Sequence, residues 1–323
     1  HLRKLRHLSE LSDEEMVNEL RIHFLKANAA TPSIETLVHA FIPHKFVDHT
    51  HPDAILALSN QLDGEKLLKE ALGETVVLLP YFPPGFKLAK AVADKLEQNP
   101  SAQAVVLMRH GLVTWGGTAS QSYGKTIELT NKAETYLQQH ARHPLTPKYS
   151  TSILEAEKRL TEIAPIVRGL LAKPTGDPDR PWARAIMQPL INKDVLNFVN
   201  SDRGKEIALT PPLTSDHLIR TKPFYLWVDS PDFTNPGSLR EQFSRAIEGY
   251  ASAYDSYVNR YAANLPDGVQ RMDSLPRVIL IPGLGALCAG KDVSAAGIVR
   301  DIAEHTLAVK AQIAAMGIYS GMN

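Results

Sequence analysis

The sequence predicts an α/β fold, in which short β-strands alternate with amphipathic helices. Runs of β-branched and other apolar residues recur at 76–79, 104–108 and 278–281, and each is followed by a break and then by a segment of helical character. Such alternation is typical of helices packed on the faces of a sheet. With 323 residues, the chain is long enough for two domains or one large one.

The first fifty residues are expected to contain two capped helices and one strand. Ser12 is followed by three acidic residues, and this predicts a helix over 11–26, because a serine cap and negative charge both favour a helix N-terminus. Ser33 similarly caps a helix over 33–42, which a proline ends. Residues 46–50 are expected to form a short strand that runs into a loop.

Further along the chain, two pairs of a strand and a helix are expected. The strands over 76–79 and 104–108 are apolar and β-branched, and prolines follow the first of them. The helices over 87–98 and 120–139 come after these strands.

A Pro-containing polar stretch at 144–149 is the preferred domain boundary, and 173–181 is a looser break. The domains are then residues 1–148 and residues 149–323. The chain starts at His1 instead of methionine and stops within a helical pattern. We therefore expect it to be the middle of a longer polypeptide.

Composition and charge exclude several classes of function. Thirty-five basic residues balance thirty-five acidic ones, so no global field favours nucleic acid or an anionic membrane. No apolar run reaches the roughly 18–20 residues that cross a bilayer. Cys288 is the single cysteine, which excludes an internal disulfide and suits a reducing cytoplasm. We therefore expect a cytoplasmic protein that captures any anionic substrate with local groups.

Three histidines carry the strongest signal of chemistry. His49 and His51 stand two residues apart at the end of the strand over 46–50, so both point to one face and can offer a nitrogen to one cation. His110 lies where a buried strand meets a glycine, and sites collect at strand ends in α/β sheets. These are either surface or hydrogen-bonded histidines, or ligands about 2.0–2.1 Å from a zinc ion. The equivalent setting of His110 favours the metal site.

Glu35 and Ser33 are open to a structural and to a functional interpretation. Glu35 sits in the first turn of the helix over 33–42, where a glutamate favours the helix dipole without any chemistry. Ser33 likewise has a plain capping explanation. The pattern alone favours the structural roles.

Three motifs within about residues 30–140 resemble the class II aldolase and adducin family: PSIETLVHAF, VDHTHPDAIL and VVLMRHGLVTWG. That family carries a Pro-Ser-Ser-Glu helix, a His-x-His-Pro strand end and a later Asn-His-Gly. More narrowly, the whole chain is similar to the middle of the bifunctional rhamnulose-1-phosphate aldolase/alcohol dehydrogenase proteins. In those proteins an aldolase part precedes a short-chain dehydrogenase domain.

The resemblance implies a role for each candidate residue. His49, His51 and His110 are expected to bind Zn²⁺ or another divalent metal and to leave a coordination position open. Glu35 is expected to be the catalytic acid/base, and Ser33 to contact the substrate phosphate. The implied reaction is aldol cleavage of a ketose 1-phosphate, rhamnulose 1-phosphate, to dihydroxyacetone phosphate and lactaldehyde.

The resemblance also implies an architecture and partners. It implies a class II aldolase-like αβα domain over 1–148 that is N-terminally incomplete, and a second α/β domain over 149–323. A short-chain dehydrogenase domain would follow outside this chain. NAD is expected only there, because the turn at Gly283 has Cys288 where a dinucleotide motif needs its third glycine. A homo-oligomer is expected that binds a small sugar phosphate and neither nucleic acid nor membranes.

The chain departs from the family pattern at two positions and in one segment. Ile34 replaces the second serine, Arg109 replaces the asparagine, and residues 1–30 contain no counterpart of the Gly/Asn-rich phosphate loop. Two alternative functions remain, an epimerase or decarboxylase of the same superfamily and a non-catalytic adducin-like scaffold. Scaffold members tend to lose the ligand histidines, and all three are present here, so the lyase is favoured.

The second half of the chain contains a stretch similar to the first. Residues 104–133 can be laid over 277–306, since both read as an apolar strand, a glycine-rich turn and a helix. In this alignment Gly283 stands where the first copy has His110. The similarity is either a chance likeness of two strand–turn–helix units or a degenerate repeat. In a degenerate repeat the second copy has lost its metal ligand and serves structure or assembly.

Overall fold

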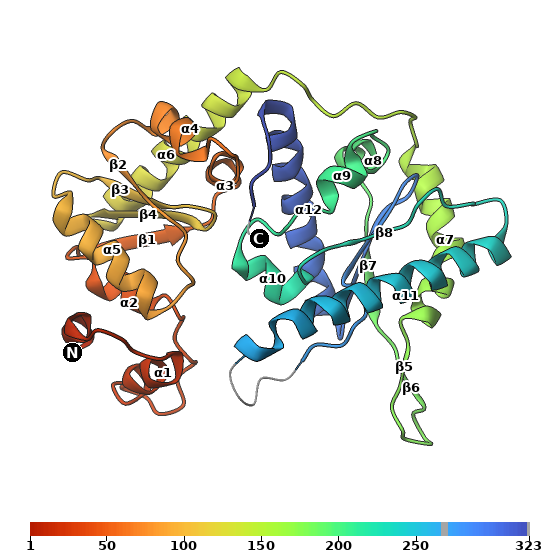
Figure 1. Ribbon diagram of the computed structural model, residues 1–323, viewed down its shortest axis with the longest axis horizontal. Coiled ribbons are helices and arrows are strands. Elements are labelled where there is room, and N and C mark those ends of the chain that lie inside the picture. The colour runs from red at the N-terminus through yellow and green to blue at the C-terminus, as the bar shows by residue number, and fades with distance from the viewer. Residues whose placement is uncertain (266–270, 322–323) are drawn as a thin grey trace. The chain divides into compact units, whose positions relative to one another are not determined.

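The computed structural model describes residues 1–265 and 271–321 (Figure 1), which divide into two compact units. The first unit comprises residues 1–141 together with 316–320, and the second is built on residues 142–315. Each unit has its own four-stranded β-sheet. The expected α/β fold is therefore confirmed in both units.

The first sheet has the strand order β1-β4-β3-β2. Its strands are β1 (Phe46–Thr50), β2 (Val76–Leu79), β3 (Ala104–Leu107) and β4 (Gly111–Gly116). β4 pairs antiparallel with both β1 and β3, whereas β2 runs parallel to β3. This pairing brings the C-terminal end of β1 and the turn between β3 and β4 to the same end of the sheet, where the strands terminate.

Helices cover both faces of this sheet (Figure 1). The 3₁₀-helix η1 (Leu2–His7) and the helices α1 (Asp13–Arg21), α2 (Thr36–Phe41) and α5 (Phe86–Gln98) share one apolar core with alternate residues of the strands. The other face carries α3 (Asp53–Ser59), α4 (Gly64–Leu72) and α6 (Ala119–His140), which contact one another and the sheet. The unit is thus an αβα layer structure.

Most elements expected in the first unit are present, and three expectations about its local structure are wrong. The strands over 46–50 and 76–79 are confirmed, and the Ser12 side chain accepts from Glu15 N–H in a capping box that starts α1. That helix ends at Arg21 instead of reaching residue 26. The second helix begins at Thr36, since a turn precedes it. The glycine-rich stretch after His110 is the strand β4.

The second sheet has the order β7-β10-β9-β8, formed by β7 (Ile186–Leu190), β8 (Leu226–Trp227), β9 (Val278–Ile281) and β10 (Gly285–Gly290). β10 pairs antiparallel with β7 and β9, and β8 runs parallel to β9. A separate hairpin joins β5 (Lys173–Pro174) to β6 (Trp182–Ala183). The strand order and directions therefore match those of the first sheet.

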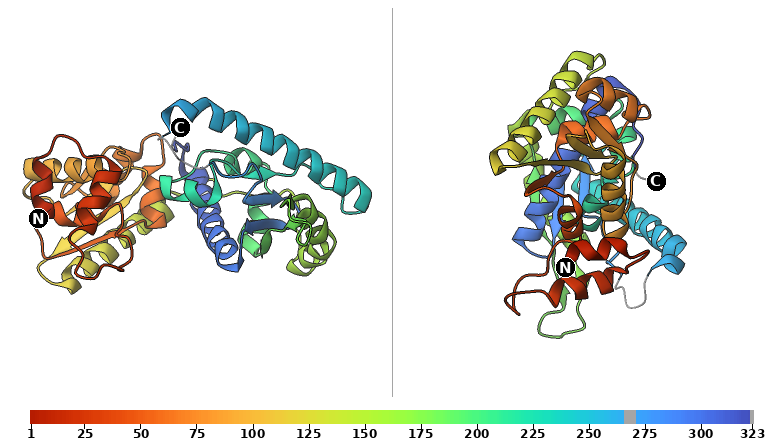
Figure 2. Two further views of the ribbon diagram at one scale, coloured as in Figure 1. Left: turned by 90° about the horizontal axis from the view of Figure 1, so that it is seen from below. Right: turned by 90° about the vertical axis from the view of Figure 1, so that its left-hand side faces the viewer.

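Helices also cover both faces of the second sheet, and Figure 2 shows α11 and α12 on opposite sides of it. One core contains α7 (Ile153–Leu170) and α11 (Pro236–Tyr261), which the 3₁₀-helix η2 (Ala262–Asn264) follows. The other core contains α8 (Lys193–Val199), α9 (Gly204–Ala208) and α12 (Val293–Met316), and α10 (Ser215–Thr221) precedes β8. Within the described residues, no helix combines the length and apolarity that crossing a bilayer requires.

Local details show that the second sheet repeats the first. Gly116 ends β4 and Gly290 ends β10, and at both positions a Cβ would press on the backbone of the helix that follows. Arg109 and Gly283, in the turns before β4 and β10, both have positive φ, 59° and 79°. These correspondences favour a degenerate repeat over chance likeness.

The strand registers correct the alignment of the two copies by one residue. Gly111 is opposite Leu107 in the first hairpin, and Gly285 is opposite Ile281 in the second. The equivalent of His110 is therefore Leu284, and the prediction of Gly283 at this position is wrong. Pairing of β1 and β7 with their neighbours likewise places Pro189 and Ile191 at the positions of His49 and His51. The second copy thus has apolar residues where the first has three imidazoles.

Candidate metal centre

The three histidines reach the same edge of the first sheet from two elements. His49 lies in β1, opposite Val113 of β4, and His51 follows directly after the strand. His110 ends the turn between β3 and β4, where its backbone N–H donates to the carbonyl of Leu107. Its side chain is only 1% exposed. Because β1 and β3 both flank β4, all three imidazoles converge.

One hydrogen bond indicates the tautomer of His49. Its Nδ1 lies 2.9 Å from the carbonyl oxygen of Leu112, and a carbonyl can only accept, so Nδ1 carries the proton. In the neutral ring, Nε2 then carries no proton, and its lone pair is available to coordinate a metal ion.

The carboxylate of Glu35 completes the group. Its Oε1 lies 2.8 Å from His110 Nε2 and 3.2 Å from His49 Nε2, and the Nε2 atoms of His49 and His51 are 3.0 Å apart. One ligand atom from each of the four residues lies within 4.8 Å of every other. Four tetrahedral ligands about 2.0–2.1 Å from a zinc ion would be roughly 3.3 Å apart. The arrangement therefore fits a divalent cation.

Buried polar atoms without hydrogen bonds support the same interpretation. Glu35 Oε1 and both ring nitrogens of His110 are buried, and apart from the contacts of Glu35 Oε1 with His110 Nε2 and His49 Nε2, none of these atoms has a hydrogen-bond partner among the described residues. Such atoms are uncommon in native proteins, because leaving a buried polar group unsatisfied costs about 1–3 kcal/mol. A cation coordinated by Glu35 and His110 would remove this cost, so these side chains can hold a metal ion.

The charge state of Glu35 follows from its surroundings. Burial raises the pKa of the carboxyl group, but the neighbouring His110 and His49 imidazoles outweigh burial and hold the pKa well below its usual range. The carboxylate is therefore anionic near neutral pH, which suits both metal coordination and proton transfer.

Ser33 and Arg109 lie beside the centre without joining it. The hydroxyl of Ser33 is exposed and accepts from the backbone N–H of Glu35 at 3.2 Å, so it shapes the turn that presents the carboxylate. The guanidinium of Arg109 donates to the hydroxyl of Ser320 at 2.9 Å. Neither side chain is among the four that form the candidate centre.

A second group of potential ligands, His1, Glu19 and His23, is weaker. Its histidines are exposed, and their rings stack with centroids 3.7 Å apart, which does not direct two nitrogens at one ion. The group around His110 is therefore the better candidate.

Gly111 shapes the candidate centre, and the sequence pattern indicated it only as a glycine after a histidine. A Cβ at this position would fall on the carbonyl oxygen of Thr50 and come within 2.7 Å of His51 Cδ2 and 3.1 Å of His49 Cε1. Only glycine therefore lets β1 bring both imidazoles against the β3–β4 turn.

We predict that Gly111→Ala weakens metal binding by about 10- to 100-fold, the range seen when groups that orient metal ligands are lost. Competition with a coloured chelator measures the affinity. Gly124→Ala is the matched control, because a Cβ there meets nothing within 4 Å. Equal metal affinity of Gly111→Ala and the unsubstituted chain would contradict this role of Gly111.

Comparisons with known proteins cover most of the chain. Residues 6–137 match the family described as "Class II Aldolase and Adducin N-terminal domain", and residues 158–323 match "Aldolase class II, second domain". The chain is 33% identical over 327 residues to "Uncharacterized oxidoreductase YuxG" of Bacillus subtilis (strain 168). This alignment covers 100% of the chain but 46% of that protein, so the chain spans less than half of this relative's length.

One solved structure is also similar in part. It is the N-terminal class II aldolase domain of a conserved protein from Thermoplasma acidophilum, with 36% sequence identity over 42% of this chain and 62% of that chain. The TM-score is 0.39.

Proposed function

The chain belongs to the class II aldolase and adducin family, and we propose that it is a metal-dependent aldehyde-lyase acting on a ketose 1-phosphate. The observation that carries this proposal is the convergence of three imidazoles and one carboxylate at an edge of the first sheet. A scaffold has no need for four buried or half-buried ligand groups in this arrangement. The retained set therefore favours an enzyme over an adducin-like structural module.

We propose Zn²⁺ as the metal, held by His49, His51 and His110. Three imidazole ligands suit zinc and leave a position for the substrate. Zinc, when bound, supplies Lewis acidity that polarises the ketose carbonyl and stabilises the negative charge left when the carbon–carbon bond breaks. The apolar residues around β3 and β4 exclude water from the histidine side of the site.

Glu35 is proposed to transfer the proton in the reaction. Its carboxylate lies beside two of the imidazoles and is 15% exposed, so it can meet both the substrate and solvent. During cleavage, the Glu35 carboxylate takes the proton of the hydroxyl on the far side of the scissile bond, and that oxygen becomes the carbonyl oxygen of the released aldehyde. The bonding electron pair moves to the carbon next to the ketose carbonyl, and Glu35 then gives the proton to that carbon.

The proposed substrate is rhamnulose 1-phosphate, which would give dihydroxyacetone phosphate and lactaldehyde. Ser33 is the proposed contact for the phosphate, because its exposed hydroxyl adjoins the turn that carries Glu35. Arg109 stands where the family has asparagine, and its guanidinium is bound to Ser320. We therefore assign Arg109 no role in the reaction.

The chain is also proposed to act as one part of a bifunctional aldolase/dehydrogenase in the cytoplasm. The name of the Bacillus subtilis relative, an oxidoreductase more than twice as long as the aligned region, supports this proposal. NAD would bind to the dehydrogenase part and not to the residues described here. Assembly into a homo-oligomer is part of the same proposal.

The proposed function is tested by two measurements on the purified chain. Elemental analysis gives the metal content, and a coupled assay follows release of dihydroxyacetone phosphate from rhamnulose 1-phosphate. We expect activity that EDTA removes and Zn²⁺ restores. Metal binding without release of any triose phosphate would instead favour an epimerase or decarboxylase, and absence of both would favour the scaffold.

A further inference from the structure

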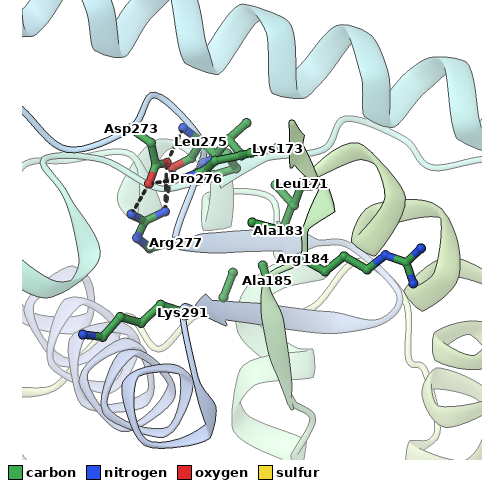
Figure 3. A pocket seen from close by; sticks show the side chains of 12 residues that line it. Leu171, Lys173, Ala183, Arg184, Ala185, Asp273, Leu275, Pro276, Arg277 and Lys291 are labelled. Carbon is green, nitrogen blue, oxygen red and sulfur yellow. Dashed lines mark hydrogen bonds and ion pairs between the residues drawn. The ribbon is translucent and has the colours of Figure 1, made fainter. Parts of the chain in front are cut away.

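A small hollow lies in the second unit, at the end of its sheet away from the β9–β10 turn. The cavity has a volume of about 170 Å³. Its apolar lining includes Ala289 and Gly290, together with Leu171, Ala183, Ala185 and Pro276, which Figure 3 labels. Since Leu284, the equivalent of His110, lies in the opposite turn, the hollow is not a remnant of a metal site.

An ion-pair group with an excess of positive charge borders the hollow, which Lys173, Asp273 and Arg277 line and Lys222 does not. Asp273 Oδ2 lies 2.6 Å from Lys173 Nζ and 2.7 Å from an Arg277 nitrogen, and Lys222 Nζ is 3.7 Å from Oδ1. Three cations therefore surround one carboxylate. The side chain of Lys222 is fully buried and also donates to the carbonyls of Asp273 and Leu275, so its charge is fixed in place.

The expected protonation states of these side chains agree with three cations around one carboxylate. Burial raises the pKa of Asp273, but Arg277 and Lys173 outweigh it and hold that pKa below its ordinary range. Burial lowers the pKa of Lys222 to about 8, which leaves most of this amine protonated at neutral pH. The group thus carries about two positive charges more than Asp273 neutralises.

Two further basic side chains line the hollow. Arg184, directly after β6, and Lys291, directly after β10, are exposed, and Figure 3 shows them extending in different directions from the floor. Among the described residues that line the hollow, Asp273 is the one acidic residue, and its carboxylate is paired with Lys173 and Arg277. Both side chains are long, exposed and part of the lining of the hollow, so their charged ends are accessible to a ligand.

We propose that this hollow binds a phosphate group, either free or carried by a small molecule. Arginine presents paired N–H donors that match phosphate oxygens, and lysine adds a point charge. Cations around an apolar floor focus the field on one small volume. The cavity is smaller than the roughly 300–1,000 Å³ of drug-sized sites, so it suits a phosphate with few attached atoms. This binding site is separate from the metal centre.

Isothermal titration of the chain with inorganic phosphate at low ionic strength tests the proposal. We expect the double variant Arg184→Gln/Lys291→Gln to bind phosphate at least about tenfold more weakly, because two charge-assisted contacts are lost. Lys193→Gln is the matched control, since Lys193 is an exposed lysine of the same unit that lines no part of this hollow. Its affinity should stay within about twofold of the unsubstituted chain.

A second variant separates this site from the metal centre. His110→Ala should leave the phosphate affinity of the hollow unchanged, because His110 is a residue of the other sheet. Three results would each overturn the proposal: no measurable heat with millimolar phosphate, equal weakening by Lys193→Gln, or loss of phosphate binding in His110→Ala. Both residues changed in the double variant are exposed, and thermal unfolding of that variant confirms that it is folded.

Discussion

Replacing His110 by alanine is expected to strip the chain of its divalent metal and to abolish lyase activity. His110 is the most deeply buried of the candidate ligands, and no other described histidine, cysteine or acidic residue joins the group. The two remaining imidazoles and the carboxylate would hold the ion weakly, because one of the four ligand groups is lost. Lewis-acid stabilisation is worth several kcal/mol, so activity should fall by about a thousandfold or more.

Metal analysis after dialysis and the triose phosphate assay measure the two effects of His110→Ala together. His39→Ala is the matched control, because His39 is an exposed histidine of α2 outside the candidate group. It should retain both metal and activity. A His110→Ala protein that is folded and still holds one equivalent of metal would show that the ion is bound elsewhere, and the ligand assignment would be wrong.

The strands at the site were predictable because local sequence marks them. β2 is a β-branched and apolar run, β1 begins with Phe46 and Val47, and a proline follows each strand within two residues. β4 was not predictable in the same way, because glycines begin and end it and resemble a turn. It becomes a strand through pairing with β1 and β3, which are distant in the chain. α3 also escaped prediction, since all but its first residue are buried and no amphipathic period shows.

The two copies of the repeat show that an ungapped sequence alignment does not give the correct register between equivalent strands. Aligning the sequences placed Gly283 on His110, because both follow an apolar strand. Hydrogen-bonded pairing shifts the match by one residue, to Leu284, and a shift of one residue reverses the face of every side chain in a strand. Loss of the metal site in the second copy is the same in both alignments. The pairing of β9 with β10 shows in addition that an apolar side chain, Leu284, occupies the position equivalent to His110.

The sequence identified the histidines of the candidate site but not the contacts that the site residues make with one another. Side chains two residues apart in a strand point to the same face of the sheet, and this rule predicted that His49 and His51 lie together. The contact of Glu35 with His110 depends on how α2 packs against the sheet, which no local pattern encodes. The requirement for glycine at 111 likewise follows from the approach of β1 to the β3–β4 turn. The candidate site thus depends on tertiary contacts between residues that local rules identify one at a time.

Replacing Glu35 by glutamine should lower kcat by about 10²- to 10⁴-fold, the usual contribution of a positioned acid or base. Glutamine keeps the size and an oxygen ligand of glutamate but cannot exchange a proton. The three imidazoles remain, so the metal content should stay near one equivalent. Because proton transfer occurs only in the reaction, kcat and kcat/KM should fall together, with little change in KM. Steady-state kinetics at saturating Zn²⁺ measure this separation.

The same variant distinguishes proton transfer from metal coordination, since Glu35 Oε1 lies close enough to His110 and His49 to serve either purpose. If coordination were its main contribution, Glu35→Gln would lose metal and excess Zn²⁺ would restore most of kcat. If proton transfer is its contribution, added Zn²⁺ leaves the defect in place. Glu74→Gln, a change at an exposed glutamate of the same unit, should alter neither quantity. The shortfall that persists at saturating metal is therefore the direct measure of the Glu35 carboxylate in the reaction.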